Sequence, residues 1–144
     1  MCYVQTLFGH QEIITSIDML IKEKAITSGG FDSSLRLWKI AEETQLVFQG
    51  KGESIECVKY LDEQHFVSGT MNGTISLWSA QKKRPLFIQE KAHGSDKFTN
   101  TPNWICSLAA HPFSDLFASG SCDGFIRLWK FTKGNSIFKS IKLN

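Results

Sequence analysis

The sequence has little of what most enzymes and membrane proteins require. No G-x-x-x-x-G-K-[ST] segment is present to hold a nucleotide phosphate, and no pair of histidines or cysteines has the spacing of zinc ligands. The longest uninterrupted apolar runs are a few residues, far short of the roughly 20 that span a bilayer. We therefore expect no metal, no cofactor, no small-molecule substrate and no membrane-spanning segment.

Charge of one sign is also nearly absent. Sixteen Lys and Arg residues oppose fourteen Asp and Glu residues, which leaves a net charge of +2 over 144 residues. So small a surplus does not predict nucleic-acid or membrane binding, and any basic site has to be local. The cysteines form no C-x-x-C pair, so we expect reduced thiols in a cytosolic or nuclear protein. They are Cys2, Cys57, Cys106 and Cys122.

The chain does contain an internal repeat. Three segments align, at residues 25–38, 66–78 and 117–129, and each ends in Leu-Trp. In each segment a serine precedes an Asp or Asn by four residues, and a tryptophan follows that Asp or Asn by six. The tryptophans Trp38, Trp78 and Trp129 lie 40 and then 51 residues apart. A period of about 40 residues is typical of one four-stranded propeller blade, and the longer spacing indicates a blade with an insertion.

Alternating β-branched and aromatic residues flank each repeat and predict two further strands per blade. The upstream runs are 13–20, 54–61 and 104–110, and the downstream runs are 44–49, 85–90 and 136–143. Asp-Gly, Asn-Gly and Asp-Ser mark the tight turns, and no helical period is evident. We predict an all-β fold of three four-stranded antiparallel blades, at 9–49, 50–90 and 91–143, with an insertion at 94–103. Residues 3–8 are expected to form the outer strand of a preceding blade.

Three blades are too few for a closed ring, because propellers close with about four to eight. We therefore expect a partial propeller. Each end blade should expose an apolar face that a neighbouring blade would otherwise cover.

Gly9-His10, the Ser-Gly-x-x-Asp turn and the closing Leu-Trp resemble the signature of WD40 repeats. The resemblance implies a hydrogen-bonded tetrad in each blade, made of a turn Asp, a loop His, a strand Ser and a strand Trp. Blade one supplies Asp32, His10, Ser28 and Trp38, and blade three supplies Asp123, His93, Ser119 and Trp129. Blade two keeps Ser68 and Trp78, but has Asn72 for Asp and Lys51 where His is expected. Since its network is incomplete, we expect blade two to open more easily.

Serine, histidine and aspartate together also suggest a hydrolase triad. That reading requires a nucleophile on a G-x-S-x-G elbow between a strand and a helix, and the sequence has no such elbow. The same trio recurs in two blades, each time followed by a tryptophan donor, so we interpret it as structural and predict no enzymatic activity. The remaining histidines, His65 and His111, are interpreted as turn or strand-edge residues.

Several stretches go beyond what the WD40 pattern demands. They are residues 3–11, Trp38-Lys39-Ile40 with the segment to Phe48, Lys82-Lys83-Arg84-Pro85-Leu86, and Ala92-His93-Gly94 before Trp104-Ile105. These stretches resemble the WD-repeat subunits of the U3 small nucleolar ribonucleoprotein, through a middle portion of their propeller. The resemblance implies a non-catalytic protein of the nucleus and nucleolus. Its implied partners are U3 small nucleolar RNA and proteins of the small-subunit processome, in pre-ribosomal RNA processing.

Two segments supply candidate contacts for RNA or a protein partner. In WD40 blades the His loops and Asp turns share one rim, and the other two loops share the opposite rim. The strongest basic cluster, Lys82, Lys83 and Arg84, falls on the opposite rim and fits either a solvated turn or a contact. The insertion on the His-side rim carries Lys97 and Phe98, and a long loop in a compact blade is often functional.

A second class of function stays open, that of a protein–protein adaptor with no RNA role, such as a ubiquitin-ligase receptor or a trafficking scaffold. The two classes require different surfaces. A basic rim that meets a phosphate backbone predicts salt-dependent binding, whereas a rim that binds protein is aromatic and little affected by salt.

Overall fold

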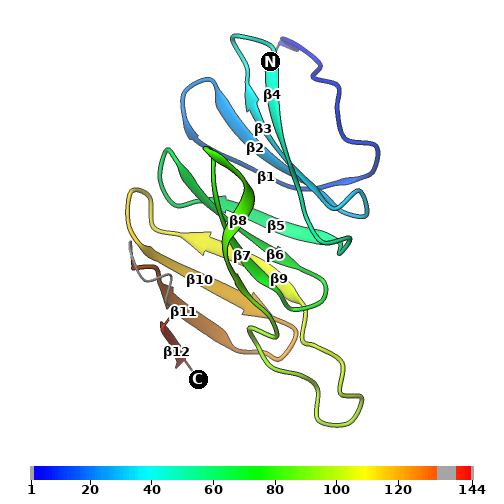
Figure 1. The fold of residues 1–144 in the computed structure, drawn as a ribbon, viewed down its shortest axis with the longest axis vertical. Coiled ribbons are helices and arrows are strands. Elements are labelled where there is room, and N and C mark those ends of the chain that lie inside the picture. The colour runs from blue at the N-terminus through cyan, green and yellow to red at the C-terminus, as the bar shows by residue number, and fades with distance from the viewer. Residues whose placement is uncertain (1, 133–138, 144) are drawn as a thin grey trace.

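Three four-stranded sheets make up the chain (Figure 1). The computed structural model describes residues 2–132 and 139–143, and these ranges hold twelve strands and no helix. Every pairing is antiparallel, and the sheet orders are β1-β2-β3-β4, β5-β6-β7-β8 and β9-β10-β11-β12. The strands are β1 (Ile14–Ile21), β2 (Lys24–Gly29), β3 (Ser34–Lys39), β4 (Thr44–Gln49), β5 (Ile55–Tyr60), β6 (His65–Thr70), β7 (Ile75–Ser79), β8 (Lys82–Gln89), β9 (Ile105–Ala110), β10 (Leu116–Ser121), β11 (Ile126–Lys130) and β12 (Lys139–Leu143). The predicted all-β fold of three antiparallel blades is confirmed.

The tight turns between the second and third strands follow the turn residues of the sequence. Gly73 and Gly124 adopt φ values of 71° and 79°, in the left-handed region that glycine enters without strain. Blade one places Ser33 at the same point, with φ of 53°. Each tryptophan then lies on a third strand, as predicted: Trp38 on β3, Trp78 on β7 and Trp129 on β11.

The sheets are stacked face to face along the long axis of the molecule (Figure 1). The first strands of the three blades, β1, β5 and β9, lie next to one another, and side chains of β1 bond directly to β5. The carboxylate of Asp18 accepts a hydrogen bond from the Tyr60 N–H at 2.8 Å and pairs with Lys59 Nζ at 3.1 Å. This contact fixes the register of blade one against blade two.

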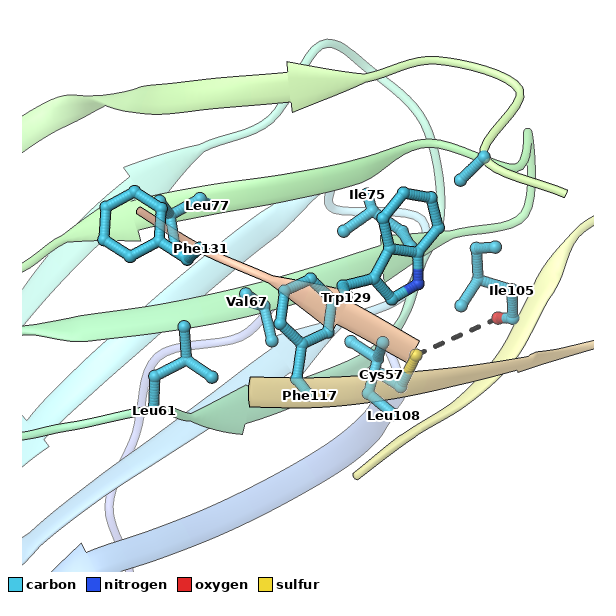
Figure 2. Packing of buried hydrophobic residues seen from close by; sticks show 11 residues of the cluster. Cys57, Leu61, Val67, Ile75, Leu77, Ile105, Leu108, Phe117, Trp129 and Phe131 are labelled. Atoms are coloured by element: carbon cyan, nitrogen blue, oxygen red, sulfur yellow. Dashed lines mark hydrogen bonds between the residues drawn. The ribbon is translucent and has the colours of Figure 1, made fainter. Parts of the chain in front are cut away.

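The core consists of two apolar layers, one at each junction between blades. The first layer joins blades one and two and contains Ile26, Leu35, Leu37, Phe48, Ile55, Val58, Tyr60, Phe66 and Trp78. The second joins blades two and three and contains Cys57, Leu61, Val67, Ile75, Leu77, Ala92, Ile105, Leu108, Phe117, Trp129 and Phe131 (Figure 2). Because the middle sheet buries both of its faces and each end sheet buries one, the stability of a blade depends on the blade beside it.

The outer faces of the two end blades are apolar and exposed, as expected. On β1, Ile17 is 65% exposed and Met19 is 63% exposed. On β11, Ile126 and Leu128 are 53% and 37% exposed, whereas Ile75 and Leu77 in the same positions of blade two are fully buried. These two faces have the pattern of a surface that packs against a further blade.

Three details of the strand prediction are corrected or lie outside the described residues. Residues 3–8 form no strand, because no strand among the described residues pairs with this segment. Its contacts include Gln5 with Glu43 in the β3–β4 turn and the Phe8 carbonyl with Gln45 on β4. The strand expected at 85–90 begins earlier, at Lys82. Of the run expected at 136–143, residues 136–138 lie outside the described part of the chain, and the rest is β12.

Candidate functional site

Blade three contains a continuous chain of side-chain hydrogen bonds. The indole Nε1–H of Trp129 donates to Ser119 Oγ at 2.8 Å, and that oxygen lies 2.7 Å from His93 Nε2. On the other side of the ring, His93 Nδ1 lies 3.0 Å from the carboxylate of Asp123. The structure thus brings together the four residues proposed for this blade.

The direction of these bonds follows from the donors available. Trp129 only donates, so Ser119 Oγ accepts from it and is free to donate its own proton to His93 Nε2. Burial lowers the pKa of His93, and the nearby Asp123 carboxylate offsets this only in part. A neutral ring with its proton on Nδ1, directed at Asp123, satisfies every partner.

Blade one builds the same chain with a different hydroxyl. The Nε1–H of Trp38 donates to Thr27 Oγ1 at 2.8 Å, and His10 Nε2 lies 2.7 Å from the same oxygen. His10 Nδ1 then meets Asp32 at 2.7 Å. The prediction of Ser28 as the hydroxyl member is therefore wrong, and Thr27 takes that place.

Strand register explains the difference. Ala25 pairs with Trp38 across β2 and β3, so the side chain two residues on, Thr27, lies on the same face as the indole. In blade three Phe117 pairs with Trp129, which puts Ser119 on that face. The turn of blade one is one residue longer, so counting four residues back from Asp32 reaches the opposite face of the strand.

Ser28 instead helps join two blades. Its hydroxyl lies 2.8 Å from Thr15 Oγ1, and Thr15 in turn donates to the Ile55 carbonyl of blade two at 2.5 Å. Ser28 is fully buried, which is consistent with this structural role.

Blade two retains half of the network. The Nε1–H of Trp78 donates to Ser68 Oγ at 2.9 Å. Lys51 is 65% exposed and its Nζ lies 3.7 Å from Glu90 Oε1, so its side chain turns away from Ser68. Asn72 is exposed in its turn. The blade therefore has no imidazole between its hydroxyl and its turn residue.

The basic cluster of Lys82, Lys83 and Arg84 is part of β8, not of a turn. All three residues are exposed, and the two-residue hairpin turn before them is formed by Ala80 and Gln81. The Ala80 N–H donates to the Gln64 carbonyl at 2.8 Å, so this turn lies beside the β5–β6 turn. A strand displays alternate side chains on opposite faces, so the three positive charges do not form a single flat patch.

The acidic neighbour of this cluster has its own hydrogen bonds. The carboxylate of Asp62 lies 2.9 Å from His65 Nδ1 and accepts from the N–H groups of Gln64 and His65. Partial burial acts to raise the pKa of Asp62, but these hydrogen bonds outweigh it and the pKa is lowered. His65 is the first residue of β6, and its hydrogen bonds to Asp62 stabilise the preceding turn, which agrees with its interpretation as a turn or strand-edge residue.

The insertion at 94–103 is ordered by one carboxylate. Asp96 Oδ1 accepts from the N–H groups of Phe98 and Thr99, each at 2.8 Å, and these bonds lower its pKa. Asn103 N donates to the Gly94 carbonyl at 3.0 Å and closes the loop. Phe98 is 97% exposed and Lys97 is exposed beside it, so the two project from the loop into solvent.

An apolar hollow lies on the same rim as the insertion. Phe31 and Met71, from the turns of blades one and two, line it together with Trp104 and Ile13. Phe31 is 77% exposed and Trp104 is 45% exposed. Phe31 and Met71 come from turns at corresponding places in the repeats, whereas Trp104 lies outside the repeat pattern and joins them only in the folded structure.

Neither a membrane-spanning helix nor a metal cluster is found among residues 2–132 and 139–143. No helix there is long and apolar enough to cross a membrane. No group of three or more His, Cys, Asp or Glu residues in that part of the chain is arranged to hold a metal ion.

Three stacked four-stranded blades, two of them closed by a Trp–hydroxyl–His–Asp chain, define a partial β-propeller. The chain belongs to the WD40 repeat family: the family described as WD domain, G-beta repeat matches residues 1–39, 42–79 and 94–130.

Particular relatives are similar over much of the chain. It is 46% identical over 94 residues to U3 small nucleolar RNA-interacting protein 2 of Homo sapiens, covering 64% of this chain and 20% of that protein. It is 30% identical over 188 residues to Ribosomal RNA-processing protein 9 of Saccharomyces cerevisiae, covering 90% and 33%. The crystal structure of the RRP9 WD40 repeats matches with a TM-score of 0.89 at 43% identity, covering 96% of this chain and 43% of that one. The chain spans a third or less of the curated relatives' length.

Proposed function

We propose that this chain is part of a non-catalytic WD40 subunit of the U3 small nucleolar ribonucleoprotein. In this proposal the protein binds U3 small nucleolar RNA and processome proteins in the nucleolus and serves pre-ribosomal RNA processing. The observation that carries the proposal is the likeness to the RRP9 WD40 repeats, which extends over 96% of this chain at 43% identity. A shared fold alone does not support a particular function. The proposal is supported by the sequence similarity to U3 small nucleolar RNA-interacting protein 2 and Ribosomal RNA-processing protein 9.

The hydroxyl–His–Asp sets do not have the geometry of a hydrolase site. The hydroxyl residues of the two sets, Thr27 in blade one and Ser119 in blade three, are buried, and each accepts from a tryptophan, so neither is presented to a substrate. Serine hydrolysis needs an accessible nucleophile beside an oxyanion hole. We therefore assign these sets a structural role.

Two surfaces are proposed to take part in RNA binding, one on each rim. On one, Lys82, Lys83 and Arg84 supply charge along β8. On the other, the exposed ring of Phe98 stands next to Lys97, a pair suited to stack on a base and meet its phosphate. Because the net charge of the chain is only +2, we expect these surfaces to contribute to a larger RNA site rather than to suffice alone.

The proposal is tested with the full-length protein. It should co-purify with U3 RNA, and its affinity for that RNA should fall with salt. Replacing Lys82, Lys83 and Arg84 with Ala should weaken binding and reduce the slope of log K against log salt by at most about two units, at about 0.7 per phosphate on a single strand. Substituting Lys97 and Phe98 with Ala tests the opposite rim.

A matched control removes the same number of charges elsewhere. Lys22, Lys24 and Lys39 lie at the corresponding end of blade one, and their replacement with Ala should leave the salt slope nearly unchanged. If neither the β8 set nor the insertion set alters U3 association or its salt dependence, these blades face proteins instead.

A protein-binding adaptor is the second candidate, and one observation favours it. The hollow formed by Phe31, Met71 and Trp104 presents aromatic and sulfur-containing side chains on one rim, the composition typical of protein interfaces. Phe31→Ser and Trp104→Ser should then abolish binding of a protein partner and leave U3 binding unchanged. If association with U3 RNA is also insensitive to salt, the adaptor function is supported.

A further inference from the structure

Blade two has a cavity at the position that the imidazole fills in blade three. The N–H groups of Gly50 and Ala92 donate to equivalent carbonyls, those of Ser33 and Gly73, at 2.7 and 2.8 Å. The next residues, Lys51 and His93, therefore occupy the same place in their blades. The side chain of His93 is fully buried, but that of Lys51 points outward to Glu90.

A second large side chain is also missing from the same place. Strand register makes Ser76 the counterpart of Arg36 and Arg127, because each pairs with the hydroxyl residue of its blade. Arg127 donates to the Ala92 carbonyl, directly beside His93. In blade two, Ser76 leaves that volume unoccupied by side chain.

Together these two changes open a cavity of about 390 Å³, within the range of about 300–1,000 Å³ typical of small-molecule sites. Its wall includes the indole of Trp78 and the hydroxyl residues Ser68, Thr70, Thr74 and Ser76, and Gln49 and Gly50 line it at the junction of blades one and two. Ser68 is only 1% exposed to solvent. Its oxygen accepts one bond from Trp78, whereas the equivalent Ser119 also meets an imidazole nitrogen.

Cations outnumber carboxylates among the residues that line the cavity. Lys51 and Arg84 both line it, Lys82 and Lys83 precede Arg84 on β8, and Lys51 Nζ lies 3.7 Å from Glu90 Oε1. The acidic residue in the wall, Glu53, already accepts a hydrogen bond from Thr70 Oγ1 at 2.9 Å.

We propose that this cavity binds one unpaired nucleobase, with Lys51 and Arg84 meeting the adjoining phosphates. The inference rests on the proposed RNA function and assigns it a specific site. The other two blades show what the space accepts, a flat heteroaromatic ring whose in-plane nitrogen meets the buried hydroxyl, next to a planar guanidinium. A nucleobase has the same shape and the same in-plane donors and acceptors, and single-stranded RNA presents such bases for recognition.

The charge at the mouth favours a nucleotide over a protein side chain. A histidine or tyrosine from a partner would fill the cavity equally well, but it would bring no negative charge to Lys51 and Arg84. A nucleotide places a phosphate within reach of both cations, and Arg is suited to bidentate contact with phosphate.

The first test maps the contact in the unaltered full-length protein. U3 RNA that carries 4-thiouridine is bound and irradiated with long-wave ultraviolet light, and the cross-linked peptides are identified by mass spectrometry. We expect cross-links in the two segments that line the cavity, residues 49–55 and 68–88. An RNA-bound protein whose cross-links all lie outside these segments would overturn the proposal.

The second test fills the cavity with the residue of the other blades. Ser76→Arg adds a positive charge, which by itself favours RNA, so weaker binding can come only from the lost space. We expect a loss in U3 affinity of about tenfold, the order of one base contact. The control Thr44→Arg adds the same charge at an exposed position of β4 and should not weaken binding.

The outcomes separate this inference from the function on which it rests. If the unaltered protein binds no U3 RNA, the proposed function fails. If it binds U3 and a folded Ser76→Arg variant binds equally well, or loses only a protein partner, the nucleobase site is wrong. Folding of the variant is checked by circular dichroism, and should it not fold, the cross-link map decides.

Discussion

Replacing Thr27 with Val keeps the shape of the side chain and removes its hydroxyl. Two groups then lose their partner at once, the Nε1–H of Trp38 at 2.8 Å and Nε2 of His10 at 2.7 Å. Both lie where water cannot replace the bond, because Thr27 is 5% exposed and Trp38 is 7% exposed. The neighbouring substitution Ser28→Ala removes one contact, with Thr15, which keeps its bond to the Ile55 carbonyl.

These contacts set the expected magnitudes. A buried donor or acceptor left unsatisfied costs about 1–3 kcal/mol, so Thr27→Val should destabilise by about 2–3 kcal/mol. Ser28→Ala should cost at most about 1 kcal/mol, because no group is left without a partner. Along the same chain, Asp32→Ala and Asp123→Ala should each cost about 1–3 kcal/mol, and the exposed Asn72→Ala clearly less.

The assay is urea unfolding of the full-length protein and its variants, with the midpoint and the m-value both measured. Hydrogen exchange at the Trp38 indole reports the local effect in blade one. An equal or larger loss for Ser28→Ala than for Thr27→Val would refute the assignment of the hydroxyl. Equal losses for the Asp32, Asp123 and Asn72 variants would refute the whole account of the tetrads.

Three further predictions concern pH, integrity and thiols. Burial lowers the pKa of His93 below its usual 6.5, so its contribution to stability is complete above about pH 6.5 and is lost as the pH falls below it. Protection of the Trp129 indole from hydrogen exchange should therefore decrease as the pH falls below 6.5, and unchanged protection between pH 7 and 5 would contradict this. The isolated 144-residue chain should associate through the exposed apolar faces of its end blades. The double substitution Ile126→Lys and Leu128→Lys should reduce this association in sedimentation experiments. A sharp thermal unfolding transition of a monomer, independent of protein concentration, would argue against the association. The buried Cys57 thiol, whose pKa burial raises to about 12, should react with a thiol reagent only after unfolding, while the three exposed cysteines react in the native state. Four fast thiols would be inconsistent with the burial of Cys57.

Much of the fold follows from the sequence, because each repeat carries its own local signals. The position of Trp78 and the Asn-Gly turn before it suffice to place β7, and the same holds for the other two blades. Alternation along 44–49 predicts β4 to the residue, since that strand begins and ends at polar turns. Residues 3–8 have the same alternation but no ladder partner, and local pattern cannot report a missing neighbour.

The errors at the site come from register, which sequence spacing does not fix. Thr27 and Ser28 are both small hydroxyl residues, and only the pairing of Ala25 with Trp38 decides which one faces the indole. Side chains alternate between the two faces of a strand, so the spacing from the tryptophan also allows Thr27 as the hydroxyl residue in place of Ser28. The aligned repeats also show Ser76 where the other blades have Arg36 and Arg127, two residues before the tryptophan, but only the structure shows that the smaller side chain leaves a cavity.

The closed loop at 94–103 has a consequence for how related chains can vary. Its ends meet at the Gly94–Asn103 hydrogen bond, and Asp96 organises its interior without help from a strand. Residues can therefore be gained or lost inside the loop while β8 and β9 keep their places. We expect sequence length to drift between species at this point, in contrast to the identity of Gly73 in the β6–β7 turn, where the Asn103 carbonyl leaves no room for a side chain.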